Sequence, residues 1–106
     1  MIKFAVVLYR REDLSVARFE EVLAGEHAEM AEALPGLRRY VQNRVVPDAT
    51  RKHPGWDAVV ELWWDGREAM EAAWASREGR RATDHLAAFV DLSRSTWSIV
   101  EEDVRR

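Results

Sequence analysis

Apolar and polar residues follow two kinds of pattern along the chain, one typical of β-strands and one typical of amphipathic helices. Residues 2–9 are apolar or aromatic except for Lys3, as in a strand that is buried on both faces. Residues 37–46, 56–65 and 95–102 alternate between two faces, with the period of two that strands have. The pattern therefore predicts four strands.

A helix is predicted for residues 16–33, between the first two strands. Ser15 is a suitable N-cap, and Pro35 and Gly36 end the segment. The apolar stripe of this helix recurs at helical spacing and includes a histidine: Val16, Phe19, Leu23, His27, Met30 and Leu34. We therefore expect the imidazole of His27 to face the core. Gly25 is unfavourable within a helix and predicts a bend or a restart close to this histidine.

Residues 67–92 form a second helical region, which we expect to break around residues 77–79. The apolar sides of its two pieces, residues 67–76 and 80–92, are formed by Met70, Ala73 and Trp74 and by Ala82, Leu86, Phe89 and Val90. His85 lies at the edge of the second apolar side. A last strand, residues 95–102, follows this region.

The predicted order is strand, helix, strand, strand, helix, strand, and a chain of 106 residues has room for one domain, residues 1–106. This order is that of the α+β ferredoxin-like βαββαβ sandwich, in which a four-stranded antiparallel sheet has both helices on one face. The strands at 2–9 and 56–65 carry large apolar residues on both sides, so the other face of the sheet needs a cover. We expect a homodimer whose two sheets pack face to face, a dimeric α/β barrel.

Composition narrows the classes of function. The chain has 16 Lys and Arg residues against 19 Asp and Glu residues, for a net charge of −3, which argues against a nucleic-acid partner. It has no cysteine, which excludes disulfides and thiolate metal sites and fits a reducing cytoplasm. No two histidines have the i, i+4 spacing of a helical zinc site, so no metal site is predicted. No segment approaches the roughly 20 apolar residues of a membrane span, so we expect a soluble, cytoplasmic protein with no membrane partner.

Several segments together resemble the EthD-like family of dimeric α/β barrels. They are the opening Met1-Ile2-Lys3-Phe4-Ala5-Val6-Val7-Leu8, the helix with Phe19 and Glu26-His27-Ala28, the connection Leu34-Pro35-Gly36-Leu37-Arg38-Arg39-Tyr40, and the strand at 56–65. The likeness spans nearly the whole chain. It implies the same fold and dimer, with a pocket between the sheet and the helices or in the barrel. The helix histidine and the strand tyrosine of the family correspond to His27 and Tyr40.

The resemblance also implies a range of activities. The family includes proteins named for ethyl tert-butyl ether degradation, a methylmuconolactone methylisomerase and relatives that resemble polyketide cyclases. Members with defined chemistry work without a metal or an organic cofactor, so none is expected here. His53 lies near a loop histidine of the methylisomerase branch, but that branch also uses a pocket cysteine, which this chain lacks.

The candidate catalytic residues are His27, Tyr40 and Glu61. A histidine can remove a proton from carbon near neutral pH, and a neutral phenol can donate a hydrogen bond to the resulting enolate oxygen. Glu61 would hold the imidazole in one tautomer, or act as the base if apolar neighbours raise its pKa. The structural alternatives are a core role for His27, a place at the dimer seam for Tyr40, and an ion pair with an arginine across the sheet for Glu61.

Four further residues are candidates for binding a small-molecule substrate: Gln42, Trp63, His53 and His85. Gln42 would orient a carbonyl group, and Trp63 would form a wall of the pocket, although tryptophans commonly pack in cores or interfaces. His53 lies in a polar loop and His85 at a helix margin, so exposed surface positions are the alternative for both histidines.

Three functions fit these residues. The first is a cofactor-independent isomerase, cyclase or lyase that uses acid–base chemistry on a small cyclic, lactone or polyketide-like compound. The second is a non-catalytic small-molecule binding or accessory protein of a degradation or biosynthetic pathway, and the third is a cofactor-free monooxygenase-like barrel. An enclosed pocket lined by both His27 and Tyr40 favours an enzyme, whereas a filled barrel with His27 hydrogen-bonded into the core favours a binding or structural role.

Overall fold

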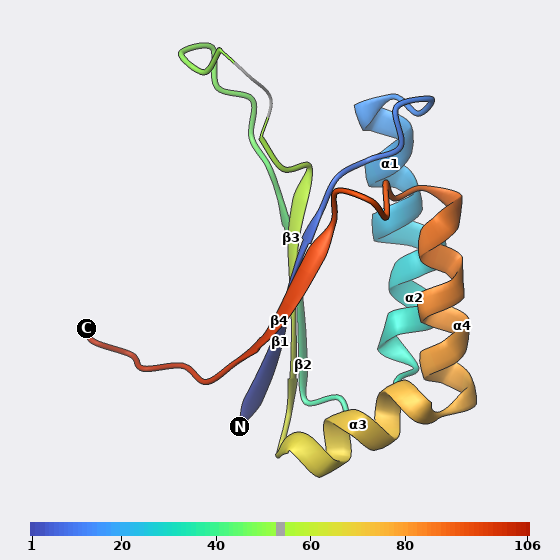
Figure 1. Cartoon of the computed structure of the whole chain (residues 1–106), viewed down its shortest axis with the longest axis vertical. Coiled ribbons are helices and arrows are strands. Elements are labelled where there is room, and N and C mark those ends of the chain that lie inside the picture. The colour runs from blue at the N-terminus through green and yellow to red at the C-terminus, as the bar shows by residue number, and fades with distance from the viewer. Residues whose placement is uncertain (53–54) are drawn as a thin grey trace.

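In the computed structural model, a four-stranded antiparallel sheet carries its helices on one face (Figure 1). The structure describes residues 1–52 and 55–106. In chain order the elements are β1 (Ile2–Leu8), α1 (Val16–Val22), a π-helical turn (Leu23–His27), α2 (Ala28–Glu32), β2 (Arg39–Arg44), β3 (Ala58–Trp64), α3 (Arg67–Ala75), α4 (Arg77–His85), a 3-10 turn (Leu86–Ala88) and β4 (Thr96–Val100). The strand order β2-β3-β1-β4 confirms the predicted ferredoxin-like arrangement.

The two central strands, β1 and β3, fix which residues face the helices. They pair in antiparallel register from Ile2 opposite Trp64 to Leu8 opposite Ala58. Successive residues of a strand point to opposite faces, so alternate positions of each strand contribute to the core under the helices. The side predicted to be apolar in residues 56–65 is the buried one: Ala58, Val60, Leu62 and Trp64. The other face of the sheet carries no helix in the part of the chain that the structure describes (Figure 1).

The first helical region, Val16–Glu32, is continuous but contains a π-helical turn at Leu23–His27. Its N-cap is the predicted one, because the side-chain oxygen of Ser15 accepts a hydrogen bond from the Arg18 amide at 3.0 Å. The π turn surrounds Gly25, where the sequence predicted a bend or restart, and inserts one extra residue into the helix. His27 at its end is nevertheless only 8% exposed, so the predicted inward orientation is confirmed.

The connection from α2 to β2 ends the helix as predicted. Gly36 has a φ of 70°, in the left-handed region that glycine adopts without strain. The indole N–H of Trp64 donates to the carbonyl oxygen of Pro35 at 3.0 Å and ties this turn to the end of β3. The chain therefore enters β2 beside the end of β3, with Arg39 opposite Trp63.

The second helical region breaks one residue earlier than predicted. Ser76 separates α3 from α4, and its side-chain oxygen accepts a hydrogen bond from the Gly79 amide at 3.0 Å, as an N-cap does. Gly79 lies inside α4, and glycine is needed there because a Cβ would collide with the backbone carbonyl oxygens of Ala73 and Trp74. The sequence predicts a break around residues 77–79, whereas Gly79 permits the close approach of the end of α3 and the start of α4.

Candidate functional site

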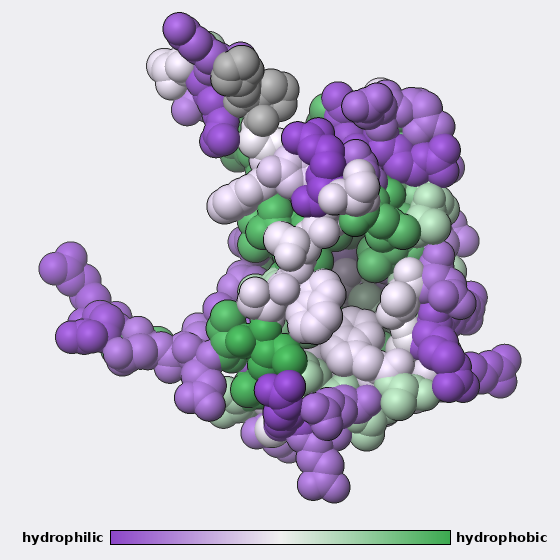
Figure 2. Space-filling model, viewed as in Figure 1, coloured by the Kyte–Doolittle hydropathy of each residue, from purple (hydrophilic) through white to green (hydrophobic). Residues whose placement is uncertain are grey.

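A cavity of about 640 Å³ lies between the sheet and the helices. Figure 2 shows this side of the molecule hollowed between the two layers. All four strands contribute to its wall, and most of the lining side chains are apolar or aromatic, among them Phe4, Leu62, Trp74 and Trp97. Within the described part of the chain, the polar side chains of the wall are those of His27, Tyr40, Arg67, Glu71 and Thr83. A largely apolar cavity with a few polar groups is the usual form of a small-molecule site.

His27 lies in the cavity wall and pairs with a second histidine behind it. Its Nδ1 lies 3.0 Å from Nδ1 of His85. The two rings are within 13° of parallel and their centroids are 5.2 Å apart, close to the N–N distance plus two ring radii. The rings therefore meet edge to edge in one plane, as an N–H···N hydrogen bond requires. Phe89 packs against both rings, with centroid distances of 5.0 Å to His27 and 5.5 Å to His85.

Burial sets the protonation state of His27. Desolvation, together with repulsion from His85 whenever that ring is protonated, lowers the pKa of His27 from 6.5 to about 4. The imidazole is therefore neutral at pH 7. Because its Nδ1 is engaged with His85, Nε2 is the ring nitrogen left for a molecule in the cavity.

Tyr40 reaches the cavity from β2 and is held by Gln42. The Nε2 of Gln42 donates to the Tyr40 hydroxyl at 2.7 Å and to the carbonyl oxygen of Leu23 at 2.8 Å. Burial raises the pKa of Tyr40, and the hydrogen bond from Gln42 opposes this shift only in part, so the phenol keeps its proton at neutral pH. Since Gln42 fills an acceptor site of the oxygen, the hydroxyl hydrogen remains available to a ligand.

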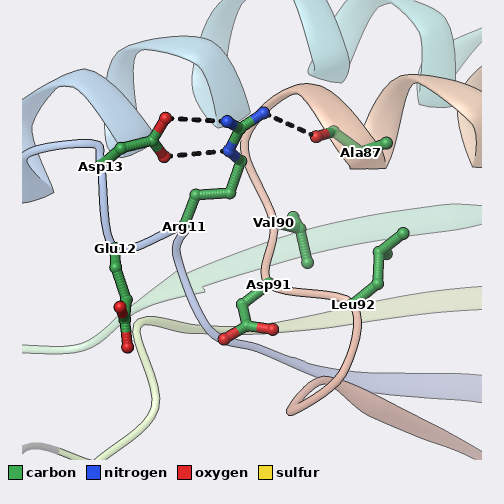
Figure 3. Close-up of a pocket in the computed structure, with 7 residues that line it drawn as sticks. All are labelled: Arg11, Glu12, Asp13, Ala87, Val90, Asp91 and Leu92. Carbon is green, nitrogen blue, oxygen red and sulfur yellow. Dashed lines mark hydrogen bonds and ion pairs between the residues drawn. The ribbon is translucent and has the colours of Figure 1, made fainter.

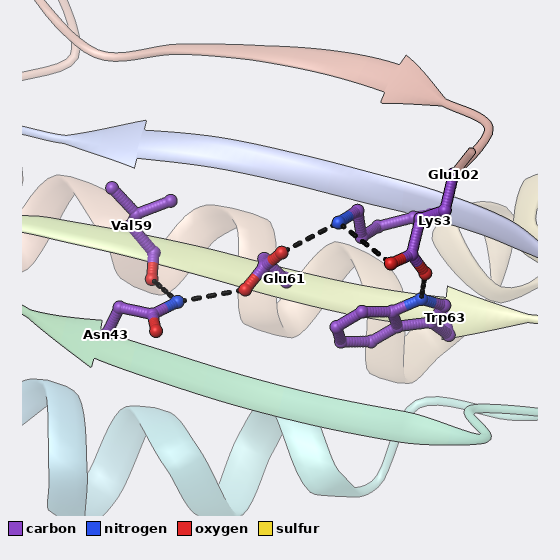
Figure 4. Close-up of polar contacts among 6 residues, drawn as sticks. All are labelled: Lys3, Asn43, Val59, Glu61, Trp63 and Glu102. Carbon is purple, nitrogen blue, oxygen red and sulfur yellow. Dashed lines mark hydrogen bonds and ion pairs between the residues drawn. The ribbon is translucent and has the colours of Figure 1, made fainter. Parts of the chain in front are cut away.

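Glu61 and Trp63 lie on the opposite face of the sheet from the cavity (Figure 4). The carboxylate of Glu61 accepts hydrogen bonds from Lys3 at 2.8 Å and from Asn43 at 3.0 Å. The hydrogen bond from Lys3 lowers the pKa of Glu61, the reverse of the shift that a general base in an apolar pocket needs. The expected contact between Glu61 and His27 is therefore not formed. Glu61 instead has the structural role of an ion pair across strands, with a lysine in place of the expected arginine.

Trp63 is a structural tryptophan on that face rather than a wall of the cavity. Its indole N–H donates to Glu102 at 2.6 Å, and the cations of Lys3 and Arg39 lie 5.1 Å and 4.8 Å from its ring centroid. These contacts leave Trp63 only 7% exposed.

His85 lies outside the cavity wall and contacts it only through His27. Its side chain is 13% exposed, and its Nε2 lies 3.5 Å from a carboxylate oxygen of Glu26. The sequence predicts that His85 contacts substrate, whereas the structure places His85 behind the cavity histidine, His27. The sequence indicated only that His85 borders the apolar side of its helix, and the pairing depends on α2 and α4 packing side by side. His53, the remaining candidate, lies outside the described residues.

In a second depression, lined mainly by residues 11–13 and 90–92, the guanidinium of Arg11 is already paired (Figure 3). The guanidinium of Arg11 donates to both carboxylate oxygens of Asp13, at 2.9 Å and 2.7 Å, and to the Ala87 carbonyl at 3.2 Å. This arginine joins the β1–α1 connection to the end of the second helical region. The depression therefore has a structural explanation, and the cavity with His27 and Tyr40 is the better candidate site.

The fold and the cavity together define a ferredoxin-like α+β domain with a small-molecule-sized space under its helices. A family model described as the EthD domain matches residues 11–93, and the chain belongs to this family. The comparison with curated proteins gives no match. Within residues 1–52 and 55–106, no helix is long and apolar enough to cross a bilayer, and no three potential metal-ligating side chains come together.

Solved structures share the fold over nearly the full chain. An ethyl tert-butyl ether d (EthD) family protein from Bacillus halodurans C-125 is 23% identical with a TM-score of 0.81, and the match covers 97% of this chain and 100% of that one. A dimeric protein of unknown function from Bacteroides fragilis is 18% identical with a TM-score of 0.70 and 95% coverage of both chains. SnoaB, a cofactor-independent oxygenase from Streptomyces nogalater, is 17% identical with a TM-score of 0.68, covering 97% of this chain and 93% of that one. At these identities the likeness establishes the fold.

Proposed function

We propose that this protein is a cofactor-independent isomerase, cyclase or lyase that acts by acid–base chemistry on a small, oxygenated cyclic compound. The observation that carries the proposal is the cavity of about 640 Å³ with both His27 and Tyr40 in its wall. His27 has a free ring nitrogen and is neutral at pH 7, and Tyr40 has a free hydroxyl hydrogen. A base and a hydrogen-bond donor facing one apolar space are the two groups that enolate chemistry needs.

In the proposed reaction, Nε2 of His27 removes a proton from a carbon next to a carbonyl group. The carbonyl oxygen then gains negative charge, and the hydroxyl of Tyr40 donates a hydrogen bond to it. Gln42 keeps the tyrosine oxygen in place through its hydrogen bonds to Tyr40 and to Leu23. Return of the proton to a different carbon completes an isomerisation, and attack of the carbanion on a second carbonyl of the same molecule completes a cyclisation.

The apolar and aromatic walls favour a compound with a flat ring system and few charges. Phe4 packs against both Trp74 and Trp97, with a ring-centroid distance of 5.0 Å to each, so an aromatic surface borders the cavity. Aromatic side chains favour offset or edge contacts with flat rings. The ion pair between Arg67 and Glu71, both about 60% exposed, marks the polar rim.

A cofactor-free oxygenase is the second candidate, because it begins with the same proton transfer. SnoaB shares the fold and is described as a cofactor-independent oxygenase. In that reaction the substrate carbanion formed by His27 would itself react with molecular oxygen. Oxygen consumption that depends on His27 would favour this candidate over an isomerase or cyclase.

Proton exchange tests the proposal, because it follows the first chemical step whatever the final product is. Bicyclic aromatic ketones such as 1-tetralone, and small unsaturated lactones, are incubated with the protein in deuterium oxide, and deuterium uptake next to the carbonyl is followed by NMR. We expect catalysed exchange by the unaltered protein and its loss in His27→Gln, whose fold is checked by circular dichroism. Binding without exchange favours the accessory-protein function, and exchange that persists in His27→Gln removes this residue from the mechanism.

We also propose that a second copy of the chain covers the open face of the sheet. That face carries the half-buried apolar side chains of Val7, Val41 and Val59, and no helix among the described residues packs on it. A protein from Bacteroides fragilis with this fold is described as dimeric. Face-to-face packing of two such sheets would bury the apolar stripe on both copies.

Solution mass tests the dimer. We expect twice the chain mass of 12.3 kDa by light scattering for the unaltered protein, and the monomer mass for Val59→Asp on the open face. Val46→Asp is the matched control, because Val46 is already 79% exposed and lies beyond the end of β2. A monomeric unaltered protein would overturn the proposal.

A further inference from the structure

Three side chains form a line from the surface to the cavity: Glu26, His85 and His27. The carboxylate of Glu26 is 66% exposed and lies 3.5 Å from Nε2 of His85. Nδ1 of His85 in turn lies 3.0 Å from Nδ1 of His27, and His27 lines the cavity. Glu26 and His27 come from the π-helical turn, and His85 ends α4, so two packed helical segments build the line.

The order of these contacts determines where the protons sit. The carboxylate of Glu26 lies 3.5 Å from Nε2 of His85, and its negative charge favours a hydrogen on that nitrogen. A neutral His85 with its hydrogen on Nε2 has a lone pair on Nδ1, and this lone pair can only accept a hydrogen bond. His27 must therefore carry its hydrogen on Nδ1, which leaves a lone pair on Nε2.

We propose that His85 and Glu26 are positioning residues that keep His27 in the Nδ1–H tautomer and so make its Nε2 the base toward a molecule in the cavity. This inference rests on the proposed function of His27. It assigns His85 a role behind the base rather than a contact with substrate. Phe89, which is fully buried, holds both rings in the plane that the N–H···N hydrogen bond requires.

The same line also accepts the proton that the base removes. When the carbon–hydrogen bond of the substrate breaks, a nitrogen–hydrogen bond forms at Nε2 of His27. The Nδ1 proton of His27 then passes to Nδ1 of His85, so His27 returns to neutral and the positive charge moves to His85. Burial disfavours the charge on His27, as its lowered pKa shows, whereas His85 has Glu26 beside it and lies in the last turn of α4, where cations are favoured.

The charged groups around the outer end of this line have both signs. A small cavity of about 170 Å³ beside Glu26 is lined by the acidic residues Glu29 and Glu78 and by Arg81. Glu26 is the carboxylate in ion-pair contact with the imidazole of His85. Glu29→Gln therefore offers a matched control for Glu26→Gln, since both remove one negative charge from neighbouring positions.

Nitrogen NMR of the histidine rings at neutral pH tests the tautomer directly, without a substrate. We expect a protonated Nδ1 and an unprotonated Nε2 on His27, and a scalar coupling between the Nδ1 atoms of His27 and His85 across the hydrogen bond. Glu26→Gln should shift His27 toward a mixture of tautomers, and Glu29→Gln should leave it unchanged. A hydrogen on Nε2 of His27 in the unaltered protein would overturn the inference.

Substitution of His85 separates tautomer control from proton transfer. His85→Gln retains an oxygen that accepts from Nδ1 of His27 but has no basic nitrogen, whereas His85→Phe has neither. We expect the Nδ1–H tautomer to persist only in His85→Gln, with a fall in kcat of at least tenfold at little change in KM in the exchange assay. Unchanged kcat in both variants would overturn the role of His85.

The two proposals fail in different ways. Absence of exchange by the unaltered protein, with His27 in the Nδ1–H tautomer, would contradict the proposed function and leave the positioning of His27 intact. Exchange that requires His27 but is unaffected by Glu26→Gln, together with an Nε2–H tautomer, would contradict the positioning alone.

Discussion

The Nδ1 atoms of His27 and His85 lie 3.0 Å apart, although 58 residues separate the two histidines in the chain. Their contact joins the π-helical turn to the end of α4 and brings the buried, cavity-lining ring of His27 against the His85 ring, whose side chain is 13% exposed. A titratable group deep in the core thereby gains a route to the surface that does not pass through the cavity.

Protein stability should fall with acidification because of His27. Its pKa is about 4 in the folded protein and near 6.5 in the unfolded chain, so the unfolded chain binds the proton first as the pH falls. The contribution of neutral His27 to the free energy of unfolding is complete above about pH 6.5. It is lost as the pH falls from 6.5 to 4, and the loss is at most about 3 kcal/mol. Urea unfolding at several pH values should show this slope in the unaltered protein and a shallower slope in His27→Gln. Equal slopes would contradict the burial of a neutral imidazole.

Removal of the Tyr40 hydroxyl should reduce catalysed deuterium exchange strongly and the free energy of unfolding only slightly. In Tyr40→Phe, Gln42 still donates to the Leu23 carbonyl, so we expect a loss of about 1 kcal/mol in unfolding free energy. Catalysed exchange should fall by at least tenfold, because the oxygen of the enolate loses its donor. Tyr9→Phe is the control, since Tyr9 packs against Arg94 outside the cavity wall. Equal activity of both variants would exclude a role for the Tyr40 hydroxyl.

Two glycine substitutions should have opposite effects on stability. A Cβ at Gly25 meets no atom within 4 Å, and alanine is favoured over glycine in helices, so Gly25→Ala should stabilise the protein by about 0.5–1 kcal/mol. A Cβ at Gly79 collides with backbone atoms of Ala73 and Trp74, so Gly79→Ala should destabilise it by about 1–3 kcal/mol. Thermal unfolding of both variants gives the comparison. Stabilisation by Gly79→Ala would show that the α3–α4 connection has room for a methyl group.

Glu61→Gln should reduce stability without affecting the cavity. It removes an ion pair with Lys3 whose side chains are 15% and 24% exposed, at a cost of about 1 kcal/mol. The pKa of Glu61 is lowered, so this contribution is present above about pH 4.5 and is lost on acidification below it. The rate of catalysed deuterium exchange should be unchanged, because Glu61 lies on the face of the sheet opposite the cavity. A loss of exchange would place Glu61 back in the site.

The sequence predicts the fold well because the apolar pattern of this chain is regular. The alternation in residues 56–65 identifies the buried side of β3, and the stripe from Phe19 to Leu34 identifies the inward side of the first helix. The inward orientation of His27 follows from the same stripe. These features depend on local periodicity, which a single sequence carries.

The contacts of the site residues depend on packing and cannot be read from local periodicity. The faces of the strands separate Glu61 from His27, but only the completed sheet shows that Glu61 pairs with Lys3 on β1. The pairing of His27 with His85 requires two helices to pack side by side at one register. Gly79 illustrates the same limit, because glycine at a close helix contact and glycine at a helix end look alike in a sequence.

The π-helical turn at Leu23–His27 makes the first helical region tolerant of a change in length. The turn already holds one extra residue, so deletion of one residue within it would restore regular α-helical pitch and leave α2 in nearly the same orientation relative to α1. The imidazole would then still face the cavity, and the sheet underneath would be unchanged. Gain or loss of a single residue here is therefore an evolutionary step that the helix can take without turning its histidine away from the interior.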